Sequence, residues 1–263
     1  YFDFLSAYSA VNQGHCHPRI IDAFIAQAKE LTLCSRAFYN DKLGLAEKFV
    51  CELFGYEKAL FMNSGAEANE TAIKLARKWG YTKKGIPENK AVIIALKQNF
   101  HGRTTTIISA STDPTSTTGF GPMMPGFEIV DYDDVDALER ALSKPEVCGL
   151  WIEPIQGEGG FMVPAPGFLT AIATWAKANG IVMIADEVQA GIARTGKWFA
   201  IEHAGLEPDI MCLAKGISSG YVPLGATVVN QRVADAFAKN QDFGGVIMHG
   251  YTYAGHPVAC AAA

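Results

Sequence analysis

Short apolar runs alternate with longer amphipathic segments along the chain. The apolar runs fall at 59–62, 91–96, 127–130, 149–152, 181–185, 210–213 and 226–229. Apolar residues recur at helical spacing in 66–81 and 166–179, and Gly180 supplies a natural end for the second segment. Continuous apolar strands that alternate with helices are typical of a parallel sheet covered on both faces. The pattern predicts an α/β fold built on seven strands.

Polar side chains follow several of these runs, at or just beyond the carboxyl end. Asn63, Glu153, Asp186 and Lys215 occupy such positions. In an open α/β sheet, ligands bind in the crevice outside the carboxyl ends of the strands. We therefore expect these four side chains to share one crevice.

Composition narrows the class of protein. The chain has 263 residues, of which 49% are apolar, so it can bury the core of one large domain. Its net charge of -5 includes no basic run, which argues against nucleic acid as a partner. No apolar stretch approaches the ~20 residues of a membrane span, so we expect no membrane partner. Six cysteines lie without paired spacing, so we expect free thiols in a reducing compartment.

Lys215 and Asp186 carry the most informative chemistry. Lys215 lies between an apolar strand and Gly216, where burial would give it a neutral amine able to form a Schiff base. Asp186 ends an apolar run, where a carboxylate needs a cationic partner such as a protonated pyridine nitrogen. Gln189 could donate to a phenolic oxygen of the same ring. Together these residues indicate a pyridoxal 5'-phosphate (PLP) site, although a solvated lysine and an aspartate that caps the next turn would explain them singly.

A phosphate site is predicted where the first strand meets the next helix. Gly65 permits close approach to the backbone N–H groups of the helix start, and Ser64 adds a hydroxyl donor. An ordinary N-cap at Ser64 explains the same residues. The glycine-rich stretch 157–160 is not followed by a Walker lysine, which weakens a nucleotide interpretation. Thr252, in a glycine-punctuated loop, could also reach a phosphate.

Residues beyond the run at 91–96 offer contacts for a ring and a carboxylate. Phe100 could cover an aromatic ring, and Arg103 presents a planar fork suited to a substrate carboxylate. A core phenylalanine and a solvated arginine are the alternatives. Glu153 fits a structural role, in which it pairs with an arginine or caps a helix. His15 and His17 lack companion ligands, so no metal site is expected.

Separated motifs occur together in the order of a known family. They are Ser64-Gly-Ala-Glu-Ala, Phe100-His-Gly-Arg, Glu153-Pro, Asp186-Glu-Val-Gln189, Lys215 and Thr252. In these motifs the chain resembles the class III (subgroup II, ω-type) PLP-dependent aminotransferases of fold type I, over nearly its whole length. The first half, including Ser35-Arg-Ala-Phe-Tyr-Asn40, looks most like ornithine δ-aminotransferases. The second half, including 191–198, looks more like ω-amino acid or 4-aminobutyrate aminotransferases.

The resemblance implies a fold and a role for each matched residue around the cofactor. The fold would be the fold type I large domain, with a mostly parallel seven-stranded sheet. Lys215 would bind PLP covalently and move the proton, and Asp186 would hold the pyridine nitrogen. Gln189 would contact the phenolic oxygen, and Phe100 would stack on the ring. The phosphate would be held by Ser64, Gly65, Ala66 and, from the partner subunit of a homodimer, by Thr252.

The resemblance also implies substrate contacts and a domain organisation. Tyr8 would line the substrate pocket, Arg103 would bind a substrate carboxylate, and Glu158 would pair with an arginine beyond the last residue given. Residues 1–263 would form the PLP-binding large domain, with 1–10 the end of an N-terminal segment. A small C-terminal domain would follow, so the chain would be an internal fragment.

The implied activity transfers the δ-amino group of ornithine to 2-oxoglutarate and gives glutamate semialdehyde and glutamate by a ping-pong scheme. One alternative is 4-aminobutyrate or another ω-amino acid as donor, with pyruvate or 2-oxoglutarate as acceptor. Others are a further PLP reaction such as an aminomutase, and a non-catalytic PLP-binding fragment. We expect a cytoplasmic protein, or one of the mitochondrial matrix if a transit peptide precedes Tyr1.

Overall fold

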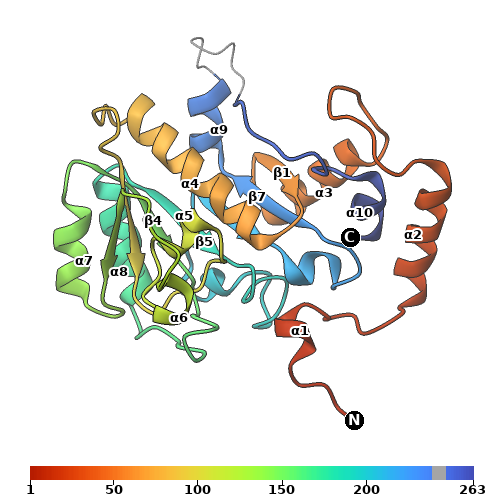
Figure 1. Cartoon of the computed structure of the whole chain (residues 1–263), viewed down its shortest axis with the longest axis horizontal. Helices are drawn as coiled ribbons and strands as arrows, with labels where there is room; N and C mark the ends of the chain where they lie inside the picture. The colour runs from red at the N-terminus through yellow and green to blue at the C-terminus, as the bar shows by residue number, and fades with distance from the viewer. Residues whose placement is uncertain (239–246) are drawn as a thin grey trace.

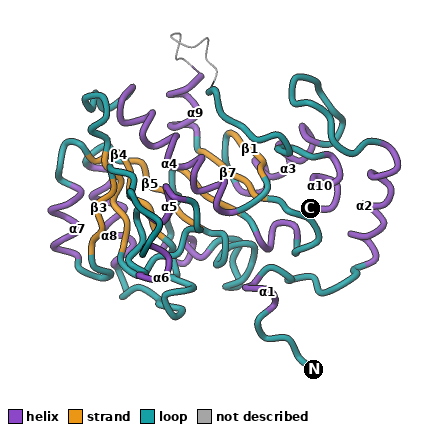
Figure 2. The backbone as a smooth tube through the Cα atoms, in the orientation of Figure 1, coloured by secondary structure: helices purple, strands orange, loops and turns teal. Residues whose placement is uncertain are grey.

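A seven-stranded sheet forms the centre of the molecule in the computed structural model, which describes residues 1–238 and 247–263 (Figures 1 and 2). Its strands are β1 (Lys58–Met62), β2 (Val92–Leu96), β3 (Phe127–Val130), β4 (Val147–Ile152), β5 (Val182–Asp186), β6 (Ile210–Leu213) and β7 (Gly225–Val229). They lie in the order β1-β7-β6-β5-β4-β2-β3. Each predicted apolar run falls on one of these strands, to within one or two residues at its ends.

The sheet is mostly parallel, as predicted. β7 pairs antiparallel with both β1 and β6, whereas every other neighbouring pair is parallel. Six strands therefore run in one direction, and their carboxyl ends meet at one edge of the sheet. The amino end of β7 lies at this same edge, because Gly225 pairs with Met62.

Helices connect and cover the strands. They are α1 (Ser6–Ser9), α2 (Pro18–Glu30), α3 (Leu43–Phe54), α4 (Gly65–Thr82), α5 (Thr105–Ile108), α6 (Pro114–Thr117), α7 (Val135–Leu142), α8 (Phe168–Ala178), α9 (Gln231–Ala238) and α10 (Pro257–Ala262), with 3-10 turns η1 (Ala200–Ala204) and η2 (Lys215–Ser218). The predicted segments 66–81 and 166–179 correspond to α4 and α8. α8 begins two residues later than predicted because Gly167, with φ 85°, adopts a left-handed conformation as its N-cap.

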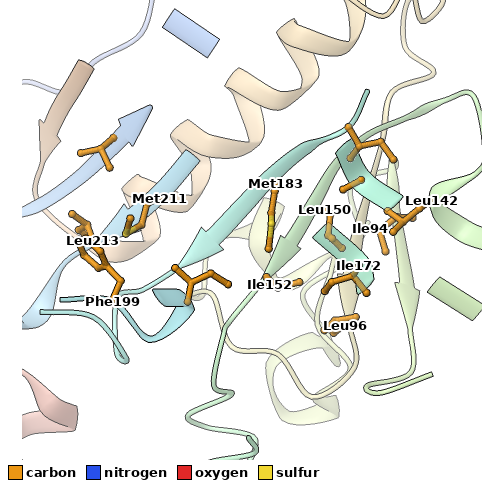
Figure 3. Packing of buried hydrophobic residues seen from close by; sticks show 14 of the residues in the cluster. Ile94, Leu96, Leu142, Leu150, Ile152, Ile172, Met183, Phe199, Met211 and Leu213 are labelled. Atoms are coloured by element: carbon orange, nitrogen blue, oxygen red, sulfur yellow. The ribbon is translucent and has the colours of Figure 1, made fainter. Parts of the chain in front are cut away.

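The two faces of the sheet pack against different helices. Leu150 and Ile152 of β4 join a buried cluster with α7 and α8, part of which Figure 3 shows. Trp151, between them in sequence, joins a second cluster with α4 and α9 on the opposite face. Successive side chains of a strand point to opposite faces, so a strand buried on both faces is apolar throughout.

Within the described residues, no helix has the length and apolar character needed to cross a membrane. All six cysteines are free thiols, as expected from their spacing.

Candidate active site

A cavity of about 320 Å³ lies at the carboxyl edge of the sheet. Its lining includes seven of the residues predicted from the sequence, Ser64, Gly65, Ala66, Phe100, Asp186, Gln189 and Lys215. They lie at or just beyond the carboxyl ends of β1, β2, β5 and β6, so the fold gathers segments that are far apart in the chain. Asn63 and Glu153 line the same cavity, which places all four strand-end residues in one crevice.

Lys215 enters this cavity from the first position of η2. Its backbone has φ 49°, a left-handed conformation that is unfavourable for a residue with a side chain. Burial lowers the pKa of Lys215 from its ordinary 10.5, while the carboxylates of Asp186, Glu158 and Glu153 act in the opposite direction. The net direction favours the neutral amine that Schiff-base chemistry requires.

Asp186 is buried at the centre of a hydrogen-bonded network. Its Oδ2 lies 2.8 Å from Nδ2 of Asn69, which donates to it, and 2.7 Å from Nδ1 of His101. Its Oδ1 accepts from the backbone N–H of Val188 at 3.0 Å, so it also caps the next turn. The His101 ring stacks on Trp151 with centroids 3.8 Å apart, and Trp151 Nε1 donates to Asn69 Oδ1 at 2.9 Å.

Asn69, His101 and Trp151 were not predicted as members of this network. His101 directly follows Phe100 in the motif Phe100-His-Gly-Arg, and Asn69 is a polar residue that α4 buries against the sheet. A buried amide on a helix that packs on strands was the available signal, because such a group needs hydrogen-bond partners. His101 lines the cavity, and its Nε2 has no hydrogen-bond partner among the described residues.

The start of α4 combines a helix cap with donors that remain available. Ser64 Oγ accepts from the backbone N–H of Glu67 at 3.2 Å, and the Glu67 carboxylate accepts from the Asn63 N–H at 2.7 Å. The N-cap interpretation is therefore correct. The N–H groups of Gly65 and Ala66 have no acceptor within the described part of the chain, so the helix end still offers an anion site.

Glu153 holds two loops of the cavity together. Its Oε1 accepts from the backbone N–H of Phe100 at 2.8 Å, and its Oε2 accepts from that of Gly157 at 3.1 Å. The prediction that Glu153 pairs with an arginine or caps a helix was wrong, because its carboxylate accepts hydrogen bonds from loop backbone instead. Burial is the main reason that the pKa of Glu153 rises to about 7. A Cβ at Gly157 would collide with Oε1 of Gln189, so Gln189 packs closely on this turn.

A second cavity of about 700 Å³ lies beside the first, and Phe100 lines both. Arg103 and Glu158, both predicted to bind substrate, line this second cavity. The Arg103 guanidinium is exposed and lies 5.6 Å from the centroid of the Phe100 ring. Tyr8 and Thr252 are exposed and line neither cavity.

The residues around the first cavity fit PLP. An amine, a buried carboxylate, an aromatic ring and free N–H groups at a helix start match its aldehyde, pyridine nitrogen, ring face and phosphate. The fit also depends on a glycine, because a Cβ at Gly65 would lie 2.8 Å from a methyl group of Val188. Among residues 1–238 and 247–263, no group of three or more His, Cys, Asp or Glu side chains is arranged to hold a metal ion.

Comparison with known proteins identifies relatives of this chain. The class-III aminotransferase family model matches residues 1–263. The mitochondrial ornithine aminotransferase of Drosophila ananassae is 52% identical over 260 residues, which are 99% of this chain and 59% of that protein. The ornithine aminotransferase of Toxoplasma gondii ME49 superposes with a TM-score of 0.94 at 46% identity, over 100% of this chain and 61% of that one. An (S)-enantioselective omega-transaminase from Thermomicrobium roseum gives a TM-score of 0.92 at 35% identity, over 100% and 63%.

The chain thus spans about three fifths of the length of the relatives that it matches. Class III aminotransferases use PLP, the cofactor that the cavity fits. Because the family model covers every residue and a relative shares half of the sequence, the chain belongs to the class-III aminotransferase family.

Proposed function

We propose that this chain forms the cofactor-binding part of an ornithine-type aminotransferase. The reaction would transfer the δ-amino group of ornithine to 2-oxoglutarate and give glutamate semialdehyde and glutamate. The observation that carries the proposal is the pairing of two adjacent cavities, one with Lys215 and Asp186 and the other with Arg103 and Glu158. The similarity to ornithine aminotransferases, which extends over 99% of the chain, supports ornithine as the amine donor.

Six residues of the first cavity would have defined tasks toward PLP. The helix start at Ser64, Gly65 and Ala66 would hold the phosphate. Asp186 would keep the pyridine nitrogen protonated, and Gln189 would donate to the phenolic oxygen. Bound in this way, the cofactor would supply an electron sink for the bond that loses its proton. Lys215 would hold the cofactor, and its amine would move that proton.

The second cavity would bind the carboxylate end of each substrate. Arg103 offers a bidentate donor fork there. Glu158 lines the same cavity and would control which substrate the site accepts by pairing with an arginine. Tyr8 lines neither cavity, but it lies in α1, whose contact with η2 brings the start of the chain near Lys215. Its exposed side chain would line the part of the substrate pocket that lies outside the two cavities.

The test compares the first half-reaction with two amine donors. Mixed with ornithine in the absence of a keto acid, the purified holoenzyme should convert its PLP to the amine form much faster than with 4-aminobutyrate. The reverse order would replace ornithine with 4-aminobutyrate or another ω-amino acid. This second candidate is favoured by the structural match to the omega-transaminase. Steady-state kinetics should be ping-pong, and an obligatory ternary complex would contradict the scheme.

We also propose a homodimer in which Thr252 of one subunit contacts the phosphate held by the other. Thr252 is exposed, and it lies outside the cavity of its own chain. A threonine hydroxyl that serves a phosphate site must then come from a second copy. Small amino and keto acids remain the substrates.

For the compartment, two candidates follow from different observations. The Drosophila ananassae relative is named as a mitochondrial enzyme, whereas free thiols fit either the cytoplasm or the matrix. We propose the cytoplasm, and fractionation of the source cells with an antibody to this chain tests it. Recovery in the matrix fraction would reject the proposal.

A further inference from the structure

A segment from the start of the chain lies against the turn that carries Lys215. We call residues 9–17 the strap. Within it, Asn12 Oδ1 accepts a hydrogen bond from the hydroxyl of Ser219, which ends η2 and lies 207 residues later in the sequence. Ser219 is buried and Asn12 is half-buried, so this hydrogen bond is partly shielded from water.

Further hydrogen bonds hold the strap on Tyr221, just after this turn, and on the segment after β5. The hydroxyl of Tyr221 donates to the carbonyl of Gly14 at 2.8 Å and accepts from the backbone N–H of His17 at 2.6 Å. Arg194 donates to the carbonyl of Ser9 at 3.2 Å. The strap is therefore fixed at both ends, with Asn12 between them.

The turn beneath the strap is conformationally strained. Lys215 has φ 49° and Ser219 has φ 52°, so two residues with side chains are left-handed within five positions. Such conformations persist only where the surroundings determine them. The hydrogen bonds of the turn itself, from Ile217 N–H to Ala214 O and from Ser219 N–H to Gly216 O, do not involve Lys215 N–H.

Asn12 also packs closely against Gly216, the residue that follows Lys215. A Cβ at Gly216 would lie 3.1 Å from Nδ2 of Asn12 and 3.2 Å from Cβ of Ile192. The backbone that follows Lys215 is thus packed closely against both the strap and the segment after β5. A change in Asn12 would remove one of these two contacts.

We propose that Asn12 is a positioning residue, which holds Lys215 in its strained conformation through its hydrogen bond to Ser219. Neither Asn12 nor Ser219 lines the cofactor cavity, so both act through the turn and not on the cofactor. The kinetic consequence rests on the proposed function, because it concerns proton movement by Lys215. The structural consequence does not, since it concerns the turn alone.

The first test measures the turn without substrate. In the purified protein freed of PLP, amide hydrogen exchange in a peptide that covers 214–224 should become about tenfold faster in Asn12→Ala, as expected for the loss of one partly shielded hydrogen bond. Ser219→Ala should give the same increase, and the double variant no further increase. Asn230→Ala is the matched control, because Asn230 donates to Asp209 near the opposite edge of the sheet. Its 214–224 peptide should exchange at the wild-type rate.

Unchanged exchange in Asn12→Ala would overturn the proposal. Ser219→Ala keeps the test valid if Asn12→Ala does not fold, because it removes the same hydrogen bond from the other partner. An increase as large in Asn230→Ala would also overturn it, since the effect would then be a general loosening of the domain.

The second test measures proton transfer in the holoenzyme. With ornithine deuterated at the δ-carbon, the isotope effect on the first half-reaction should increase in Asn12→Ala, because a misplaced Lys215 makes proton transfer slower relative to other steps. An unchanged isotope effect, with exchange faster, would reject a role in proton transfer. Absence of any reaction with ornithine in the wild type would instead reject the proposed function and leave the exchange result as the test of Asn12.

Discussion

The hydrogen bonds around Asp186 determine how well this site can hold a positively charged ring. A buried carboxylate is costly unless it is paired, and here Asn69 and His101 both lie within hydrogen-bond distance of the same oxygen. Trp151 fixes the His101 ring by stacking on it. The carboxylate is therefore oriented before any ligand binds, which lowers the cost of binding.

Replacement of His101 tests this orientation. His101→Phe keeps an aromatic ring against Trp151 but removes the contact with Asp186. A hydrogen bond to a charged group is worth roughly 1.5–3 kcal/mol, so the affinity for PLP should fall about 10–100-fold. Equilibrium titration of the PLP-free protein measures this. His203→Phe, which alters an exposed histidine beside Thr195, is the control and should bind PLP as the wild type does. Equal affinity in both variants would contradict the assigned role of the network.

The pH dependence of PLP attachment tests the environment of Lys215. Only the neutral amine attacks an aldehyde, and burial lowers the pKa of Lys215 from its ordinary 10.5. The rate of covalent attachment to the PLP-free protein should therefore rise with pH and reach half its maximum below pH 10.5. Asp186→Asn should move this midpoint lower still, because the Asp186 charge stabilises the ammonium form. Asp131→Asn, which alters an exposed carboxylate paired with Lys97, should leave it unchanged.

A midpoint at or above pH 10.5 would show that Lys215 is solvated, as the simpler interpretation of its sequence position holds. An upward shift in Asp186→Asn would contradict the sign of the interaction between the two residues.

At the residue scale, the sequence could predict the groups that follow apolar strands but not their partners. Lys215 and Asp186 were recognisable because a charged residue directly after an apolar strand is costly to bury unless it has a partner. The partner of Asp186, His101, lies 85 residues earlier, and that of Ser219, Asn12, lies 207 residues earlier. Side-chain contacts at such separations depend on the packing of the whole domain.

Among the elements, α4 links the core to the cofactor site. Its side chains pack on β4, β6 and β7, and its first residues form the predicted phosphate site. Gly65 belongs both to the core and to the cofactor site. It lines the cavity, and a side chain at this position would collide with Val188, which packs against the core.

Two glycine substitutions of the same kind should have opposite effects. In Gly65→Ala, the Cβ at 2.8 Å from Val188 forces the helix start away from the segment after β5, so we expect a lower melting temperature and weaker binding of both PLP and inorganic phosphate. In Gly44→Ala, within α3, nothing lies within 4 Å, so the gain in helix propensity should stabilise the protein by about 0.5–1 kcal/mol. Thermal unfolding with and without phosphate compares them. Unaltered phosphate binding in Gly65→Ala would show that the start of α4 is not part of the phosphate site.

The seven strands, α4 and α8 were predicted from the sequence, but the antiparallel direction of β7 was not. An apolar run such as that of β7 has the same pattern whether it runs parallel or antiparallel to its neighbours. The start of α8 was also misplaced, since only the left-handed conformation of Gly167 marks the boundary. Both depend on backbone geometry that side-chain polarity does not encode.

At the scale of the whole molecule, the proposed sharing of Thr252 predicts complementation between defective subunits. Lys215→Ala and Thr252→Ala homodimers should each retain PLP poorly, because the first lacks the covalent link and the second a hydroxyl at the phosphate. A mixed dimer should contain one intact site, formed by Lys215 of one subunit and Thr252 of the other. PLP retained after gel filtration of the isolated mixed dimer measures this. Retention of about one PLP per dimer supports the shared site, whereas none would place Thr252 in the site of its own chain.

Lys215 is the residue that we propose to hold PLP. Borohydride reduction followed by peptide mass mapping tests this assignment directly. Reduction of the holoenzyme should fix PLP on the peptide that contains Lys215. In Lys215→Ala the same treatment should leave every peptide unlabelled. Labelling of a different lysine in the wild type, or of none, would contradict the account.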